Sequence, residues 1–379
     1  MTAINLSRKS GDAAPPPAGQ RPAARVWQIL QSALLRPFLA VLGALAVGAV
    51  ILAVFGYDPV HAYAVMGQGV FGNLRNFTEV LVKATPLIFT GIAVAVAYTG
   101  GVWNIGGEGQ FYLGAIGAAV VGLYGGGLPP IVLVPLVLAA GFVAGGLWAT
   151  IPGLLKAWVD ANEVVVTIML NYIAMGLASF LVTGPLQEAR GYYPQTELIA
   201  EAARLARLLP PTRLHLGFIL AIALALIMTV VLRRTPLGYA IRTIGASLNT
   251  ARFAGIPVNR TIVTAMLLSG GAAGLGGAVE IAGLTWRLYA TVSSGYGFDG
   301  IAVSLLVQNH PLGTILSGLL FGALRAGSEL MQMNAGIPAV LIEIIQGLTI
   351  AFVIGLSAWR GFKAGRRRSA AERAGRTWK

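Results

Sequence analysis

Long apolar stretches alternate with short polar segments along most of this chain, and their lengths decide its fold class. Each stretch has about 17 to 25 residues with almost no charge, enough for a helix to cross the apolar core of a bilayer, which is about 30 Å thick. The stretches cover residues 38–56, 80–99, 130–151, 164–184, 214–232, 261–282 and 337–357. The pattern predicts an all-α polytopic membrane protein.

Basic residues gather between these stretches and at both ends of the chain, and they set the expected orientation. Five precede residue 37, five arginines and no acid occupy 233–260, and eight basic residues follow residue 358. Because cytoplasmic segments are enriched in Lys and Arg, the tails 1–36 and 359–379 and the loop 233–260 are expected inside the cell. The first tail is also expected to be disordered. The net charge of +13 therefore does not indicate a nucleic-acid partner.

The number of crossings follows from these charges. An odd number must follow residues 261–282 to return the C-terminus to the cytoplasm, and Pro311 supplies a break within the apolar stretch 299–329. A permease domain at 37–358 then holds about ten transmembrane helices: 38–56, 79–99, 108–124, 130–151, 163–184, 214–232, 261–282, 299–309, 312–329 and 337–357. A re-entrant pair at 299–329 satisfies the same charges, and the sequence leaves the two open.

Spans two to five and seven to ten share one plan. Each group has a full span, a glycine-rich broken segment with one acid, a short span and two further spans. The broken segments are 100–110 and 295–311, in which "GGEGQF" (106–111) corresponds to "GFDGIA" (297–302). Because one span links the groups, they enter the membrane from opposite sides. This predicts an inverted repeat, an architecture of many transporters whose substrate sites lie at the repeat interface.

The first broken segment places a carboxylate at membrane depth. Glu108 costs about 2.5–3.5 kcal/mol there on insertion scales unless it finds partners, and non-helical backbone at that depth is tolerated only where protein buries it or water reaches it. In one interpretation Glu108 caps the first turn of the helix that it begins. In the other it belongs to a substrate pathway formed by Trp103, Asn104, Glu108, Gln110, Asn171, Asp299, Gln308 and Asn309.

Polar and small residues inside other spans are open to two interpretations. Glu163, Thr167 and Asn171 share one helix face, and Glu343 and Gln346 lie three residues apart. Both sets suit hydrogen bonds between helices, worth about 0.6 kcal/mol each, as well as a pathway. Glycines four residues apart predict close helix packing at three positions, Gly141/Gly145, Gly270/Gly274 and Gly318/Gly322.

Motifs for catalysis are absent from the sequence. It has no cysteine and no G-x-x-x-x-G-K-[ST] or H-E-x-x-H motif, and its three histidines are scattered. "GYGFDG" (295–300) matches a dinucleotide-binding motif by letters, but it joins two membrane spans. We therefore expect no enzymatic activity, no cofactor and no metal site in this chain.

Two loops offer surfaces outside the membrane. In 233–260, Ser247 can cap a short helix that ends before Gly255 and Pro257, either to dock a cytoplasmic partner or to lie on anionic lipid. The loop 185–213 is expected on the extracytoplasmic side with a short helix at 197–208. It can meet a donor protein or serve as a solvated lid.

Several stretches resemble one transporter family. "GVWNIGGEGQFYLGA" (101–115) looks like the "FNIGxEGQ" signature of ATP-binding cassette (ABC) importer permeases for branched-chain amino acids, ribose and nucleosides. "PLGYAIRTIGASLNTARFAGI" (236–256) is similar to the coupling-helix segment of that family. Residues 83–110 and 154–174 resemble its nucleoside and simple-sugar branch. The resemblance covers roughly residues 38–358, and Trp103 departs from the usual Phe, which puts the shape of any pocket in doubt.

The resemblance implies partners and roles. It implies a separate cytoplasmic ATPase, a second and often different permease subunit, an extracytoplasmic substrate-binding lipoprotein, and a place among the lipids of the bacterial inner membrane with both termini cytoplasmic. The residues implied in ATPase coupling are Arg242, Gly245, Ser247, Asn249, Phe253 and Gly255.

Nucleosides are the favoured cargo, and a simple sugar is the alternative. Trp103, Tyr112 and Phe298 are expected to stack a base, while Asn104, Gln110 and Asn309 are expected to read its polar edges. An ion-coupled secondary transporter, which also uses inverted repeats and broken helices, and a scaffold subunit without transport remain as rival hypotheses.

Overall fold

The computed structural model describes residues 42–338, 340–348, 351–352 and 355; the predicted tails at 1–36 and 359–379 lie outside them. The described part is helical, with two isolated β-bridges and no longer strand. Its helices are Leu42–Val54, α2 (Pro59–Phe71), α3 (Leu74–Thr99), α4 (Gly107–Tyr124), α5 (Pro130–Val159), α6 (Glu163–Thr183), α7 (Gly217–Arg234), α8 (Pro236–Ala246), α9 (Leu248–Phe253), α10 (Val258–Glu280), α11 (Tyr296–Leu306), α12 (Gly313–Ala335) and residues 340–348.

Five of the described helices are long and apolar enough to cross a membrane: α3, α5, α6, α7, and α10 with its extension to Thr285. This agrees with the predicted all-α polytopic membrane protein. The eleven residues of α11 rise only about 16 Å, so this helix covers about half of an apolar core, as expected for the short span.

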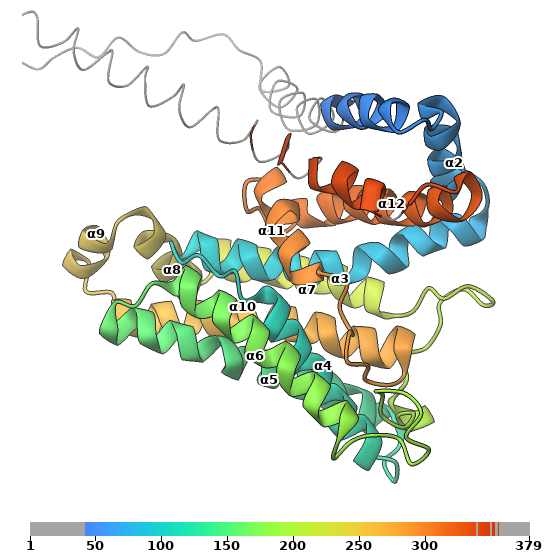
Figure 1. Ribbon diagram of the computed structural model, residues 1–379. Helices are drawn as coiled ribbons and strands as arrows, with labels where there is room; N and C mark the ends of the chain where they lie inside the picture. The colour runs from blue at the N-terminus through green and yellow to red at the C-terminus, as the bar shows by residue number, and fades with distance from the viewer. Residues whose placement is uncertain (1–41, 339, 349–350, 353–354, 356–379) are drawn as a thin grey trace, which may run out of the picture.

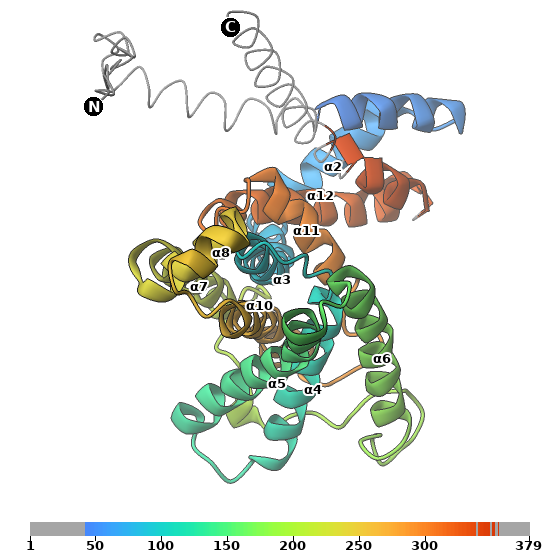
Figure 2. The ribbon, with the colours of Figure 1, turned by 90° about the vertical axis from the view of Figure 1, so that its left-hand side faces the viewer.

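α3 and α10 run side by side through the centre of the bundle (Figures 1 and 2). α11 and α12 pack against α3, whereas α4 and α5 pack against α10. We call α3, α11 and α12 the α3 unit, and α10, α4 and α5 the α10 unit. The two units have reciprocal arrangements, because the first helix of each predicted repeat packs against the second and third helices of the other.

Glycines allow the helices of each unit to approach closely, as predicted from their spacing. A Cβ atom added to Gly114 of α4 would lie 2.1 Å from the carbonyl oxygen of Gly274 in α10, and one added to Gly145 of α5 would lie 2.5 Å from that of Gly270. In the α3 unit, a Cβ at Gly322 of α12 would lie 2.8 Å from Val80 O of α3. Backbones therefore touch within both units.

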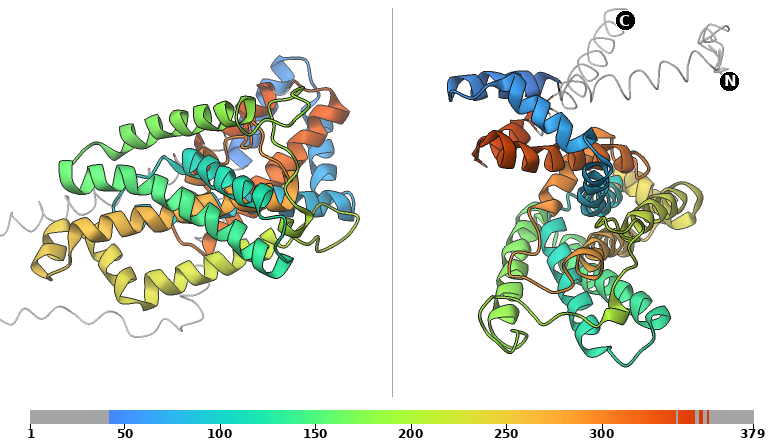
Figure 3. Two further views of the ribbon diagram at one scale, coloured as in Figure 1. Left: turned by 90° about the horizontal axis from the view of Figure 1, so that it is seen from below. Right: turned by 90° about the vertical axis from the view of Figure 1, so that its right-hand side faces the viewer.

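Residues 195–216 form a strap across one end of the bundle, the end seen in the right panel of Figure 3. Backbone amides of Ile199 and Leu205 donate to the carbonyls of Trp286 and Ala282, beyond the end of α10, and Ala200 N donates to Gly122 O in α4. These bonds tie the strap to two helix ends.

Local structure differs from the expectations at three places. The helix expected at 197–208 is only one 3₁₀ turn, Glu201–Ala203, because this segment directs its amides to neighbouring segments instead of to itself. The helix α2 was missed, although Asp58 caps it and Pro59 is its first residue. Pro236 also begins α8 in addition to ending the preceding span, because Thr235 caps the new helix through Gly238 N.

The glycine contacts make a testable prediction about stability. Gly114→Ala should lower the free energy of unfolding by about 1–3 kcal/mol, because the new methyl group overlaps the backbone of α10. Thermal unfolding of the purified chain measures the effect. Gly176→Ala in α6 is the control: nothing lies within 4 Å of its added Cβ, so it should be neutral or stabilising by about 1 kcal/mol. Equal melting temperatures for the two variants would contradict the packing described here.

Candidate functional site

The N-termini of α4 and α11 meet where the α3 and α10 units touch. Glu108, in the first turn of α4, is 2% exposed, and its Oε2 accepts a hydrogen bond of 2.7 Å from the backbone N–H of Gly297 in α11. A Cβ atom at Gly297 would lie 2.0 Å from Glu108 N. Only glycine therefore permits this approach of the two helix ends.

Glu108 acts as a helix cap, but not in the way expected. Its carboxylate satisfies an amide at the start of α11, not the first turn of its own helix. The N-terminus of a helix carries partial positive charge and free N–H groups, so a carboxylate there is stabilised. Because α4 belongs to the α10 unit and α11 to the α3 unit, the cap joins the two units at the centre of the bundle.

A pair of side-chain amides lies beside this junction. Asn104 and Gln110 exchange two hydrogen bonds of 2.9 Å, and Asn104 Nδ2 also donates to Ser269 Oγ of α10 at 2.8 Å. Ser269 Oγ in turn donates to Ala93 O of α3 at 2.6 Å. Both amides are almost fully buried, so the non-helical segment 100–106 is held between α3 and α10.

Asn171 of α6 completes the support of this segment. Its Oδ1 accepts from Gly109 N at 2.8 Å, and its Nδ2 donates to Ile105 O at 3.0 Å. Asn171 is fully buried. In this conformation, the side-chain amides of Asn104 and Asn171 therefore form hydrogen bonds with backbone groups in the non-helical segment and at the start of α4, and Asn104 and Gln110 bond to each other.

Trp103 is a predicted pathway residue with a large exposed surface. It is 45% exposed and contacts Tyr98 edge to face, with ring centroids 4.9 Å apart. Both rings line a hollow between α3, the segment 100–106 and α11. Its other lining residues are Val94, Asn104, Ile105, Ile301 and Leu305. The hollow offers aromatic and aliphatic walls beside one amide group.

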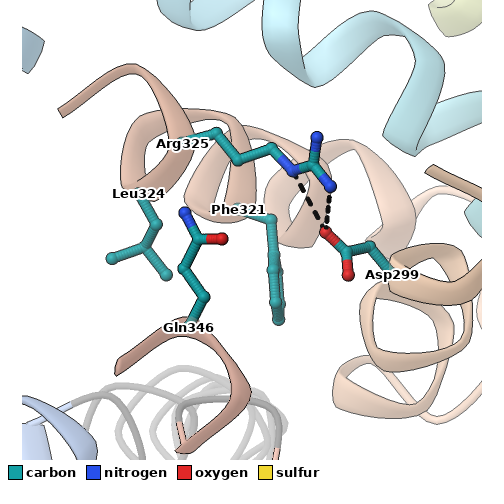
Figure 4. Close-up of a pocket in the computed structure, with 5 residues that line it drawn as sticks. All are labelled: Asp299, Phe321, Leu324, Arg325 and Gln346. Carbon is teal, nitrogen blue, oxygen red and sulfur yellow. Dashed lines mark hydrogen bonds and ion pairs between the residues drawn. The ribbon is translucent and has the colours of Figure 1, made fainter. Parts of the chain in front are cut away.

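Asp299 lies in a second pocket, shown in Figure 4. Arg325 of α12 donates to Asp299 Oδ2 from two nitrogens, at 2.8 and 3.1 Å, and its guanidinium lies over the ring of Tyr296, 4.8 Å from the centroid. Phe321, Leu324 and Gln346 form the remaining walls. The sequence analysis missed Arg325, although an ionisable residue inside an apolar span is itself a signal of a functional or paired site.

The remaining predicted pathway residues form a turn at the far end of α11. Gln308 and Asn309 have left-handed backbone, with φ of 55° and 59°. Asn309 Oδ1 accepts a hydrogen bond of 2.9 Å from Ser304. The structure thus brings Asn104, Glu108, Gln110 and Asn171 together and places Trp103 at their edge. It leaves Asp299 within α11, and Gln308 and Asn309 beyond the C-terminal end of that helix.

The predicted base-stacking residues are also separated. Tyr112 is buried in the core, whereas Phe298 is 42% exposed on α11. Ser269 was missed altogether. It lies among glycines in α10, and no sequence signal distinguishes it from the small residues that pack there.

The segment expected to couple to an ATPase forms two helices at the opposite end from the strap, labelled α8 and α9 in Figure 1. Ser247 caps α9 by accepting from Thr250 N, and Gly255 follows the helix with φ of 72°, both as expected. Gly245 touches the end of α3, since a Cβ there would lie 2.1 Å from Thr99 O. Phe253 is 94% exposed.

The other two residues of that set make few contacts. Arg242 Nε donates to Gly238 O of its own helix at 3.3 Å, and Asn249 is exposed. α8 and α9 therefore present an exposed surface that is anchored to the core of the bundle through Gly245.

Comparison with known proteins identifies the family. The chain is 38% identical to the glucose ABC transporter permease protein TsgB13 of Haloferax volcanii over 87% of this chain and 89% of that one. It is 38% identical to the guanosine ABC transporter permease protein NupP of Bacillus subtilis (87% and 95%) and 33% identical to the nucleoside ABC transporter permease protein NupB of Lactococcus lactis (84% and 90%). The model of one permease family matches residues 76–354. This chain therefore belongs to the family of permease components of the branched-chain amino acid transport system.

Proposed function

We propose that this chain is one permease subunit of an ABC importer that carries nucleosides, or a simple sugar, by alternating access. Separate ATPase subunits hydrolyse ATP, because the sequence has no phosphate-binding motif of its own. A second permease subunit, often a different one, completes the membrane core, and a substrate-binding lipoprotein delivers cargo from outside.

The reciprocal packing of the α3 and α10 units is the observation that carries this proposal. Inverted repeats predict such an exchange, in which the first helix of each repeat packs with helices of the other repeat. The Glu108–Gly297 contact lies where the two units meet. We take the ten crossings of the sequence analysis as the topology, with α11 crossing half of the membrane.

The proposed orientation puts α8 and α9 in the cytoplasm and the strap outside. It rests on the arginines of 233–260 and on both basic tails, which the positive-inside rule places together in the cytoplasm of a bacterial cell. The exposed Phe253 of α9 then projects toward the ATPase, and the contact of Gly245 with Thr99 transmits movement to α3.

The cargo class is proposed from the relatives together with the hollow at Trp103. The names of two of the three relatives mention guanosine or nucleosides, and the name of the third mentions glucose. Aromatic rings beside an amide suit a nucleobase, which stacks on the rings and pairs through its polar edge. Asn104 takes part in this role once the units have separated enough to expose it.

One prediction of the proposed function concerns cargo. The complete transporter in proteoliposomes should accumulate radiolabelled guanosine or another nucleoside when ATP is inside, and Trp103→Ala should weaken that uptake by about tenfold, the scale of a lost stacking contact of about 1–3 kcal/mol. Trp148→Ala in α5 is the control for loss of an indole elsewhere. If the transporter accumulated only glucose or ribose, the cargo would be a simple sugar and not a nucleoside.

The same preparation tests the rival mechanism. If the chain without its ATPase accumulated solute in response to a proton or sodium gradient, it would be an ion-coupled secondary transporter. If the complex hydrolysed ATP and accumulated solute equally well when this chain was deleted, the chain would be a scaffold.

Another prediction of the proposed function concerns coupling. Phe253→Ala should leave the melting temperature unchanged, since the ring is 94% exposed, but should reduce uptake about tenfold or more if the ring is an anchor at the ATPase interface. Phe180→Ala in α6, where the ring is 63% exposed, should leave uptake intact. Normal uptake in the Phe253 variant would remove α9 from the coupling surface.

A further inference from the structure

Seven charged side chains gather at the strap end of the helix bundle, between the α3 and α10 units. Such residues are costly at membrane depth and usually pair with one another or serve a function. Of these seven, the sequence analysis singled out only Asp299. They are Glu79 and Lys83 of α3, Arg213 of the strap, Glu280 of α10, Asp299 of α11, and Arg325 and Glu329 of α12.

Every cation of this cluster has its own acidic partner. Lys83 pairs with Glu329, Arg213 pairs with Glu79 at 2.5 Å, and Arg325 pairs with Asp299 at 2.8 Å. Three cations and four acids leave one carboxylate over. That carboxylate belongs to Glu280.

Glu280 is 6% exposed and has no hydrogen bond to its carboxylate from any described residue. Ser269 of α10 bonds to Ala93 of α3, and Gly276 lies against Phe89, so the two helices run antiparallel and Glu280 comes close to the turn of α3 that carries Lys83. The charges of Lys83, Arg213 and Arg325 act on its carboxylate. The backbone leaves α-helical geometry at the next residue, where a π-helical turn runs from Ile281 to Thr285. Such turns often mark functional positions. A buried carboxylate facing cations that other acids already hold is unstable relative to one with a partner of its own.

The positions of these residues suggest what that partner is. Lys83 and Glu329 both belong to the α3 unit, so their present ion pair lies within one unit. Glu280 belongs to the α10 unit. A pair between Lys83 and Glu280 would instead cross the boundary between the units at the proposed extracytoplasmic end.

We propose that Glu280 is the second ion-pair partner of Lys83: the lysine binds Glu329 in this conformation and Glu280 in the other conformation of the transport cycle. The exchange replaces a contact inside the α3 unit by one between the units. Lys83 then pairs with one of the two acids in each conformation, and Glu329, whose side chain is 52% exposed, is the acid that solvent can reach when it is left unpaired. This inference rests on the proposed alternating access, but not on the identity of the cargo.

Two variants separate an exchange from a purely structural ion pair. Glu280→Gln removes the second partner while it keeps the shape of the side chain. The double variant Lys83→Glu with Glu329→Lys rebuilds the present pair with reversed charges, but in the other state it sets the carboxylate introduced into α3 against that of Glu280. The control reverses another pair at the same end, Arg287 with Glu188, whose atoms lie 3.3 Å apart and which is not among the charges that act on Glu280.

Each variant is assembled into the complete transporter in proteoliposomes. The measurements are the melting temperature, the rate of ATP hydrolysis, and uptake of whichever labelled solute the unmodified complex accumulates. Glu280→Gln should melt at the same temperature or higher, because a buried unpaired charge is gone, yet uptake and ATP hydrolysis should fall about tenfold, within the usual range of a conformational coupling. The Lys83/Glu329 reversal should fold but remain equally slow, whereas the Arg287/Glu188 reversal should work normally.

Three results would overturn the proposal. The first is normal uptake by Glu280→Gln. The second is full recovery of uptake in the Lys83/Glu329 reversal, and the third is a lower melting temperature for Glu280→Gln with activity reduced only in proportion to folded protein. If the reversal variant does not fold, Glu280→Gln alone decides. ATP hydrolysis needs no assumption about cargo, so an absence of nucleoside uptake in the unmodified complex would refute the cargo and leave this test intact.

Discussion

The fold depends on one hydrogen bond between two helices that both begin inside the bundle. A helix that starts at membrane depth exposes N–H groups that lipid cannot satisfy. Here the carboxylate of Glu108, at the start of α4, accepts from Gly297 N at the start of α11, and glycine at that position lets the two backbones touch. The carboxylate and the free amides of the opposing helix end compensate each other, so each broken segment stabilises the other inside the bundle.

The contrast between contacts within units and contacts between them follows from the same arrangement. Inside each unit, glycines bring helix backbones together along their length, as at Gly114 with Gly274. Between the units, the polar contacts are few and local, chiefly Glu108 with Gly297 and Ser269 with Ala93. Helices α3 and α10 also pack against each other along the boundary, but its polar contacts can be broken and remade one by one. The alternating access proposed above uses this combination.

The sequence predicted the helices whose signals are local and missed what depends on distant contacts. Apolar length indicated the long spans, glycine spacing indicated close packing, and Ser247 with Gly255 marked the ends of α9. The partner of Glu108 could not be read from the sequence, because Gly297 lies 189 residues away. The strap is not helical because its backbone amides donate to carbonyls at the ends of α4 and α10. The role of Ser269 depends on Asn104, which comes from another segment.

Movement of the α3 unit relative to the α10 unit is the central claim, and a distance measurement tests it most directly. The chain has no cysteine, so spin labels can be attached at introduced cysteines without background, at Met333 of α12 and Tyr124 of α4, which are 79% and 76% exposed. Pulsed electron resonance on the complete transporter would compare this distance with and without ATP and vanadate, beside a pair within the α10 unit at Tyr124 and Val159. We predict that the first distance changes by several ångströms while the second stays constant. A constant distance between the units, or an equal change within the α10 unit, would contradict the account.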